Sequence, residues 1–230
     1  MADGGVTILT GAASGIGRAA AEALARKSRT LALVDVHAEM LAEVATACRK
    51  QSPKSANFVC DVTDAAAVAR TCRQIREKLG AASVLINCAG IGRHLPFLET
   101  QPEEWERMFQ VNVMGAVHFT RAVLPEMLAA RDGLVINVGS RMAVDSHPNT
   151  TAYAASKAAL LAFSKSLALE VKQHGVKISL LAPGGTKTRI DTPKHEGYLE
   201  PAAIADAIVY IIENGGKAWV RDLVVLPLDF

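Results

Sequence analysis

Short runs of β-branched and other apolar residues alternate with longer Ala- and Leu-rich segments along almost the whole 230-residue sequence. Several short runs, such as residues 84–86 and 134–136, are apolar at every position rather than at every second one. Strands buried on both faces read in this way, which indicates a parallel sheet covered by helices on each side. Strands are expected at 6–10, 30–35, 55–60, 83–87, 133–138, 177–181 and 222–226, and helices near 15–27, 38–50, 64–79, 103–130, 151–174 and 201–214. The sequence therefore predicts a single α/β domain over residues 1–230, built on a doubly wound (Rossmann-type) sheet of seven parallel strands.

Composition and charge exclude several other classes of protein. Half of the residues are hydrophobic and the formal net charge is +2, so neither a nucleic acid nor an acidic membrane surface is expected as a partner. No apolar run is long enough to cross a bilayer, and the opening residues lack the basic start of a secretory signal. The cysteines (Cys48, Cys60, Cys72 and Cys88) form no close pair of the kind that zinc or redox motifs need. We therefore expect a cytoplasmic protein with reduced thiols and no metal site.

The first expected strand leads directly into a glycine-rich segment at 10–17, which opens an Ala-rich helix. Glycines let the backbone turn sharply and approach a pyrophosphate, while the start of the helix presents its amide groups to the phosphates. A glycine triplet alone could serve a tight turn, but an acid, Asp35, follows at the end of the second strand. Its carboxylate can accept both ribose hydroxyls of NAD and would repel the 2′-phosphate of NADP, for which Ser14 offers no cation. NAD is therefore the expected cofactor, and a helix-capping role for Asp35 is the alternative.

A second pattern places Tyr153 and Lys157 four residues apart, on one face of an expected helix. A free tyrosine has a pKa of about 10 and is a poor base at neutral pH. A nearby ammonium favours the phenolate, so the pair can accept and donate a proton at a hydroxyl or carbonyl group. An ordinary surface pair is the alternative interpretation of this spacing.

Taken together, these pieces occur in the order in which the short-chain dehydrogenase/reductase family carries them. From residue 6 to about 226, the chain resembles the short, single-domain branch of that family. The matching positions are 10–17, Asp35, Asp61-Val62-Thr63, Asn87-Cys88-Ala89-Gly90, Asn112, Ser140, Tyr153 with Lys157, and Pro183-Gly184. Any single piece is weak, and their ordered conjunction carries the resemblance.

The resemblance implies catalytic roles for Asn112, Ser140, Tyr153 and Lys157. Tyr153 would give a proton to a carbonyl oxygen during reduction or take it from an alcohol during oxidation, and Ser140 would hydrogen-bond the same oxygen. Lys157 would lower the tyrosine pKa and bind the nicotinamide ribose, while Asn112 would hold a water of the proton relay. The cofactor contacts implied are Gly11, Ser14, Gly15, Ile16, Gly17, Asp35, Asp61, Val62, Asn87, Ala89, Gly90, Tyr153, Lys157, Pro183, Gly184, Thr186 and Thr188. In isolation, Ser140 could merely cap a turn and Asn112 could bond to backbone.

The substrate pocket is expected between residues 91–95, Arg141, Met142, His147 and a short loop near 187–200. Several cations gather at its expected mouth, namely Arg93, His94, Arg141, Lys187, Arg189, Lys194 and His195. They could attract a carboxylate or a phosphopantetheine thioester, or they could be scattered surface charges. His94 and His147 could also lie near the reacting carbon, or face solvent.

Two features depart from the family pattern. Cys88 stands where an asparagine is usual, and the chain ends in 226–230 without the common Gly-rich segment. This ending weakens the expectation of the family's common tetramer. The helices at 103–130 and 151–174 resemble the family's dimer-forming pair, so a homodimer is preferred and a tetramer stays open.

The sequence thus predicts an NAD(H)-dependent oxidoreductase that interconverts a small-molecule secondary alcohol and a ketone. One alternative is a 3-oxoacyl-thioester reductase, which usually prefers NADPH; Asp35 counts against it. Another is a non-catalytic, dinucleotide-binding regulatory protein, which would be free to lose Ser140, Tyr153 or Lys157.

Overall fold

A sheet of seven parallel strands forms the centre of the protein. The computed structural model describes residues 5–190, 196–216 and 218–228. The strands are β1 (Val6–Thr10), β2 (Leu31–Asp35), β3 (Ala56–Val59), β4 (Ala82–Asn87), β5 (Gly133–Val138), β6 (Val176–Pro183) and β7 (Asp222–Val225). They lie in the order β3-β2-β1-β4-β5-β6-β7, which confirms the doubly wound, Rossmann-type α/β fold predicted from the sequence.

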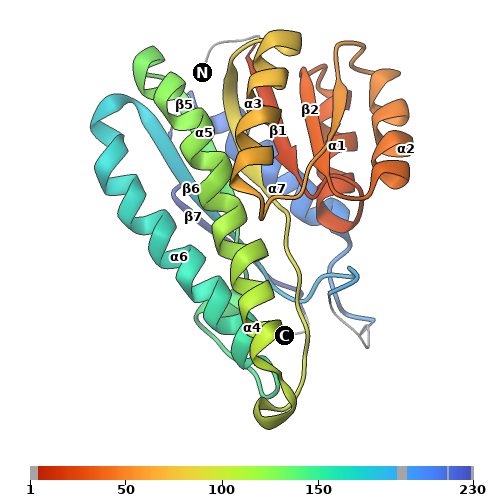
Figure 1. The fold of residues 1–230 in the computed structure, drawn as a ribbon, viewed down its shortest axis with the longest axis vertical. Coiled ribbons are helices and arrows are strands. Elements are labelled where there is room, and N and C mark those ends of the chain that lie inside the picture. Colours follow the sequence, from red (N-terminus) through yellow and green to blue (C-terminus); the bar gives the residue numbers. More distant parts are fainter. Residues whose placement is uncertain (1–4, 191–195, 217, 229–230) are drawn as a thin grey trace.

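Helices cover both faces of this sheet (Figure 1). The helices are α1 (Gly15–Arg26), α2 (Ala38–Arg49), α3 (Ala65–Leu79), α4 (Pro102–Phe109), α5 (Gly115–Ala130), α6 (Thr151–Val171) and α7 (Pro201–Asn214). Leu41 of α2 and Ile208 of α7 share the core of one face, whereas Phe119 of α5 and Val171 of α6 share the core of the other. Every residue of β1, β2 and β5 is buried, which explains why these strands are apolar without alternation.

The strand order fixes where a ligand can bind. From β1 the chain builds outward to β2 and β3, and then returns to place β4 on the opposite side of β1. The connections that follow β1 and β4 therefore diverge and leave a crevice beyond the carboxyl ends of the strands. Sheets of this kind bind their ligands there.

The helix expected over 103–130 is interrupted, which corrects the sequence prediction. α4 ends at Phe109, a π-helical turn occupies Gln110–Met114, and α5 begins at Gly115. The π turn inserts a residue and directs Asn112 towards Ile91, whose backbone N–H and C=O both hydrogen-bond its side chain. The turn contains neither glycine nor proline, so composition gave no sign of it. The helix expected over 151–174 ends at Val171 and continues as one 3₁₀ turn.

Candidate active site

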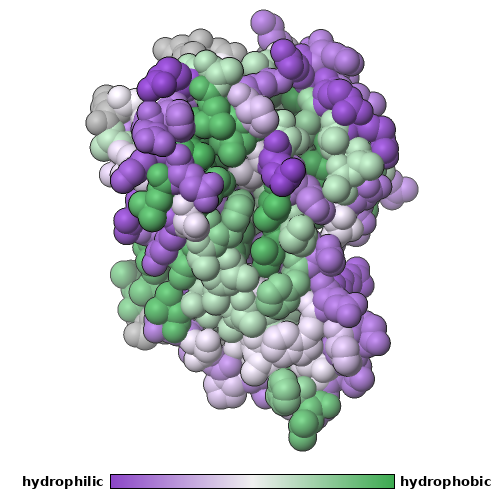
Figure 2. Space-filling view, turned by 60° about the vertical axis from the view of Figure 1, so that its left-hand side comes forward, coloured by the Kyte–Doolittle hydropathy of each residue, from purple (hydrophilic) through white to green (hydrophobic). Residues whose placement is uncertain are grey.

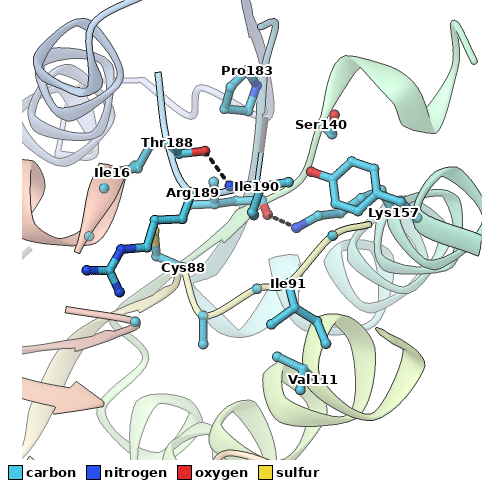
Figure 3. A pocket seen from close by; sticks show the side chains of 18 of the residues that line it. Ile16, Cys88, Ile91, Val111, Ser140, Lys157, Pro183, Thr188, Arg189 and Ile190 are labelled. Atoms are coloured by element: carbon cyan, nitrogen blue, oxygen red, sulfur yellow. Dashed lines mark hydrogen bonds between the residues drawn. The ribbon is translucent and has the colours of Figure 1, made fainter. Parts of the chain in front are cut away.

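A cavity of about 1160 Å³ opens at the carboxyl ends of the strands. It exceeds the range of roughly 300–1,000 Å³ usual for small-molecule pockets, and so offers room for a dinucleotide beside a second molecule. In Figure 3, Ser140 and Lys157 lie on one side of this cavity and Ile16 and Thr188 on the other. All catalytic and cofactor-binding residues predicted from the sequence line it except Asn87 and Asn112.

Glycines shape the loop between β1 and α1. Gly11 and Gly15 have φ angles of 69° and 53°, and a Cβ on Gly17 would lie 2.0 Å from the carbonyl oxygen of Gly11. Within the described residues, the N-cap Ser14 makes no side-chain capping hydrogen bond, and the first turn of α1 has no acid. The amide groups at the start of α1 therefore meet no anionic side chain of their own turn, an arrangement that fits a pyrophosphate.

Asp35 ends β2 and lines the same cavity. One of its carboxylate oxygens accepts a hydrogen bond from the N–H of Ala13 at 3.0 Å, and the other accepts from the N–H of His37 at 3.0 Å. The N-cap position of α2 is held by His37, so Asp35 does not have the capping role considered as its alternative. The two bonds fix the carboxylate at the cavity wall and leave each oxygen lone-pair capacity for a ribose hydroxyl.

Asp61 and Val62 follow β3 and form the wall nearest to α5. Oδ1 of Asp61 accepts the N–H and the hydroxyl of Thr63 at 2.9 and 2.8 Å. Val62 packs closely on Gly115. If Gly115 carried a Cβ, that atom would lie 2.7 Å from Cγ2 of Val62. A glycine at the start of α5 is therefore required to bring this helix against the Val62 wall.

The segment after β6 bridges the two sides of the cavity. If Gly15 carried a Cβ, that atom would lie 3.4 Å from Cγ2 of Thr188, so the two residues are close neighbours. Oγ1 of Thr188 accepts a hydrogen bond from the N–H of Ile190 at 3.2 Å (Figure 3). Arg189 extends across the cavity in Figure 3 and donates to the sulfur of Met40 on α2 at 3.7 Å. Thr188 is thus positioned beside the glycine loop.

The catalytic candidates Ser140, Tyr153 and Lys157 are all buried and all line the cavity. Nζ of Lys157 donates to the carbonyl oxygen of Val138 at 2.9 Å and lies 5.8 Å from the ring centroid of Tyr153 (Figure 3). Burial lowers the pKa of Lys157 from 10.5 to about 8, because desolvation disfavours the charged amine. Ser140 does cap a turn, accepting the N–H of Met142 at 3.1 Å, but this bond leaves its O–H to donate into the cavity.

Asn112 and Asn87 lie behind the cavity wall. The amide of Asn112 donates to the carbonyl oxygen of Ile91 at 2.9 Å and to the hydroxyl of Ser156 at 2.9 Å, so its N–H groups are used within the protein. Asn87 donates to Oδ1 of Asn137 at 2.8 Å, in the core between β4 and β5. The side-chain amide of Asn87 thus points into the core, and the cofactor contact expected of this residue stays a prediction.

The substrate side of the cavity contains Ile91, His94, Met142 and Ile190. Ile91, Met142 and Ile190 pack with Trp105 around Tyr153, so an apolar wall adjoins the phenol. The ring of His94 lies 6.1 Å from that of Tyr153, centroid to centroid.

The cations expected at the mouth have different partners. Arg93 forms an ion pair with Glu104, and Lys187 forms one with Glu200. Arg141 contacts His147, with 2.8 Å between Nη2 and Nε2, and its Nη1 lies 4.0 Å from Oδ2 of Asp145. Lys194 and His195 lie outside the described residues.

One group of polar cavity residues was missed in the sequence. They are Glu103, Glu106, Arg107 and Gln110, which line the cavity from α4 and the π turn. Their spacing of three, one and three residues is that of one helical face, and this polar stripe before Asn112 was the signal that could have found them.

The model of the short chain dehydrogenase family matches residues 5–199. This chain belongs to the short-chain dehydrogenase family. The 2,3-dihydro-2,3-dihydroxybenzoate dehydrogenase of Bacillus subtilis is 34% identical over 186 residues, which cover 81% of this chain and 71% of that protein. The 3-oxoacyl-[acyl-carrier-protein] reductase of Thermotoga maritima is 32% identical over 87% of this chain and 80% of its own. The alcohol dehydrogenase of the archaeon Thermococcus sibiricus, complexed with 5-hydroxy-NADP, matches with a TM-score of 0.90 at 27% identity over 97% of both chains.

Membership of the short-chain dehydrogenase family confirms the resemblance found in the sequence, and makes the chain an oxidoreductase with a fold that binds nicotinamide dinucleotides. The archaeal structure holds a derivative of NADP, so the expected preference for NAD gains no support from it. Among the described residues, no helix is long and apolar enough to span a membrane. Within the same part of the chain, no three His, Cys, Asp or Glu side chains gather in a way that could hold a metal ion.

Proposed function

We propose that this protein interconverts a secondary alcohol and a ketone with NAD(H), using Tyr153 as the acid and base. The observation that carries the proposal is that Tyr153, Lys157 and Ser140 are buried in one cavity wall, with the ammonium 5.8 Å from the phenol ring. An ordinary surface pair, the alternative interpretation of the Tyr153–Lys157 spacing, would not be buried. The cofactor, when bound, supplies the hydride or accepts it.

Each of these side chains has a distinct task in the proposed reaction. In oxidation, the phenolate of Tyr153 takes the proton from the alcohol hydroxyl; in reduction, the phenol returns it to the carbonyl oxygen. The O–H of Ser140 donates to the same oxygen and stabilises the charge that develops on it. The ammonium of Lys157 lies in a poorly solvated wall, so its charge acts strongly on the nearby phenolate. The carbonyl of Val138 holds this ammonium in place.

NAD is the proposed cofactor because Asp35 presents a fixed carboxylate where a 2′-phosphate would need a cation. The N–H groups of Ala13 and His37 hold this carboxylate, so it cannot turn away without leaving two backbone donors unbonded. Arg18, a cation near the glycine loop, is paired with Glu22 on its own helix at 3.0 Å. These contacts support discrimination against NADP.

A 3-oxoacyl-thioester reductase is the second candidate, because one relative carries that name. Such enzymes usually prefer NADPH, and Asp35 opposes that cofactor. A regulatory protein that only binds the dinucleotide would not require Ser140, Tyr153 and Lys157 to line one cavity.

We further propose a homodimer formed through α5 and α6. The two helices run along the same side of the molecule (Figure 1), and Figure 2 shows a broad band of hydrophobic residues over this side. Leu169 of α6, a large apolar residue, is 65% exposed. A four-helix bundle with a second copy would cover such a surface, and sedimentation velocity measures its formation.

The proposed reaction is tested with a panel of small secondary alcohols, each offered with NAD and with NADP. Absorbance at the nicotinamide band reports turnover. Oxidation with NAD, far faster than with NADP, supports the proposal. Turnover of 3-oxoacyl thioesters with NADPH in preference to the alcohols indicates the second candidate, and NADH binding without any turnover indicates a regulatory protein.

A further inference from the structure

His118 of α5 links that helix to one wall of the cavity. Its Nδ1 atom lies 3.0 Å from the carbonyl oxygen of Val62, a buried residue that lines the cavity. A carbonyl oxygen can only accept a hydrogen bond, so Nδ1 of the imidazole carries a proton and donates it. Val62 belongs to a motif that predicts cofactor contact, whereas His118 belongs to none.

The bonded carbonyl lies in the part of the wall that adjoins the expected ribose site. Asp35 and Val59 are paired at the ends of β2 and β3, and the N–H of Cys60 donates to the carbonyl oxygen of Asp35 at 3.0 Å. Val62 follows two residues later. A base joined to a ribose that Asp35 holds would therefore reach Val62, whose apolar side chain suits the face of an adenine ring.

The backbone of Val62 depends on His118 for its place against α5. The other hydrogen bonds of residues 61–64 stay within this turn or join it to Cys60 and to the start of α3. Among the described residues, the carbonyl of Val62 accepts from His118 alone. Without this donor, the contact between Val62 and α5 would rest on apolar packing, such as that on Gly115, and apolar packing is not directional.

We propose that His118 is a positioning residue for the adenine end of the dinucleotide. Its hydrogen bond fixes the backbone of Val62 and thereby the wall on which the adenine rests. His118 is not among the described residues that line the cavity, so it acts through Val62. The inference rests on the dinucleotide site of the proposed function, and it does not depend on the alcohol chemistry.

The experiment compares the two halves of the cofactor. ADP-ribose contains the adenine end without the nicotinamide, and reduced nicotinamide mononucleotide contains the nicotinamide without the adenine. ADP-ribose binding is measured by calorimetry, and binding of NADH and of the mononucleotide by fluorescence, so no turnover is needed. His118→Leu, which removes the donor, should weaken binding of ADP-ribose and NADH by about 3- to 10-fold, the usual effect of one neutral hydrogen bond. Binding of the mononucleotide should not change.

Three further variants separate positioning from folding. His118→Ala, a second variant without a donor, should show the same pattern as His118→Leu. His118→Asn, whose side-chain NH₂ group takes nearly the place of Nδ1, should restore most of the affinity for ADP-ribose. His174→Leu replaces an exposed histidine on the 3₁₀ turn after α6, and it should bind all three ligands as the wild type does.

Two results would overturn the inference. One is an unchanged affinity for ADP-ribose in both variants without a donor. The other is an equal loss for ADP-ribose and the mononucleotide, which would assign His118 a general structural role. In either case the proposed function stands if secondary alcohols are oxidised with NAD. If no alcohol is oxidised while ADP-ribose binding still depends on His118, the proposed function is wrong and the positioning role stands.

Discussion

Replacing Lys157 by methionine should make the cofactor-free protein more stable while abolishing its activity. Burial lowers the pKa of Lys157 from 10.5 to about 8. Each pKa unit corresponds to about 1.4 kcal/mol, so at pH 7 holding the charged amine in the folded state costs about 3 kcal/mol of stability. Methionine has a similar length and carries no charge. Its introduction also removes the hydrogen bond to Val138, which is worth about 1 kcal/mol, so the net gain is about 2 kcal/mol.

For a chain of this length, about 2 kcal/mol corresponds to a rise in Tm of about 4–8 °C, which circular dichroism resolves easily. The gain must also depend on pH. Because the folded pKa lies below the unfolded one, the unfolded chain holds a proton between pH 8 and 10.5 that the folded protein has lost. The stability of the wild type therefore rises with pH across this window, and the advantage of Lys157→Met disappears towards pH 10.5.

Lys165→Met provides the matched control, since Lys165 is exposed on the same helix. It should change Tm by no more than about 2 °C. A Lys157→Met protein that melts at or below the wild-type temperature at pH 7, or whose advantage persists unchanged at high pH, refutes the reasoning. Either result would mean that water or a rearranged side chain solvates the ammonium in the cofactor-free protein.

Three other substitutions test the rest of the site. Tyr153→Phe should lower kcat/KM by about 10²- to 10⁴-fold in steady-state assays, while NADH titrated by fluorescence still binds with wild-type affinity. The wild type should prefer NAD over NADP by roughly 30- to 1000-fold in kcat/KM, and the double change of Ser14→Arg with Asp35→Ser should relax or reverse this preference; comparable wild-type use of NADP would contradict it. Gly17→Ala should destabilise the protein by about 1–3 kcal/mol in urea unfolding, because its Cβ would lie 2.0 Å from the carbonyl oxygen of Gly11; an unchanged midpoint would show that the loop can yield.

The sheet could be predicted because its strands are buried on both faces. In β1, β2 and β5 every side chain packs into one of two cores, so a run of apolar residues is the only pattern compatible with the fold. The glycine loop could be predicted equally well, because the backbone there requires glycine at two positions. Gly11 has a positive φ, and Gly17 lies directly against the carbonyl group of Gly11.

The π turn could not be predicted, because its cause lies in tertiary structure. Residues 110–114 have an ordinary helical composition, and the extra residue is stabilised by the bonds of Asn112 to Ile91 and Ser156, which are distant in sequence. For the same reason the sequence did not show that the amides of Asn112 and Asn87 hydrogen-bond to neighbouring elements, and their roles towards a ligand stay predictions. The family position of an asparagine predicts that the residue belongs to the site. It does not show whether the side-chain amide contacts the ligand or supports the cavity wall.

The charge of the cavity mouth could not be predicted from the sequence either, because it depends on which residues pair with each cation. A count of cations in the sequence predicts a positive opening, yet Arg93 and Lys187 are balanced by Glu104 and Glu200, and α4 adds acids to the rim. Because Coulomb energy falls with distance and is weakened by solvent, a balanced exposed cation contributes little to ligand choice. Ligand choice in this cavity is therefore set by which charged groups lie against the bound molecule and how each is paired and solvated, rather than by the number of basic residues nearby.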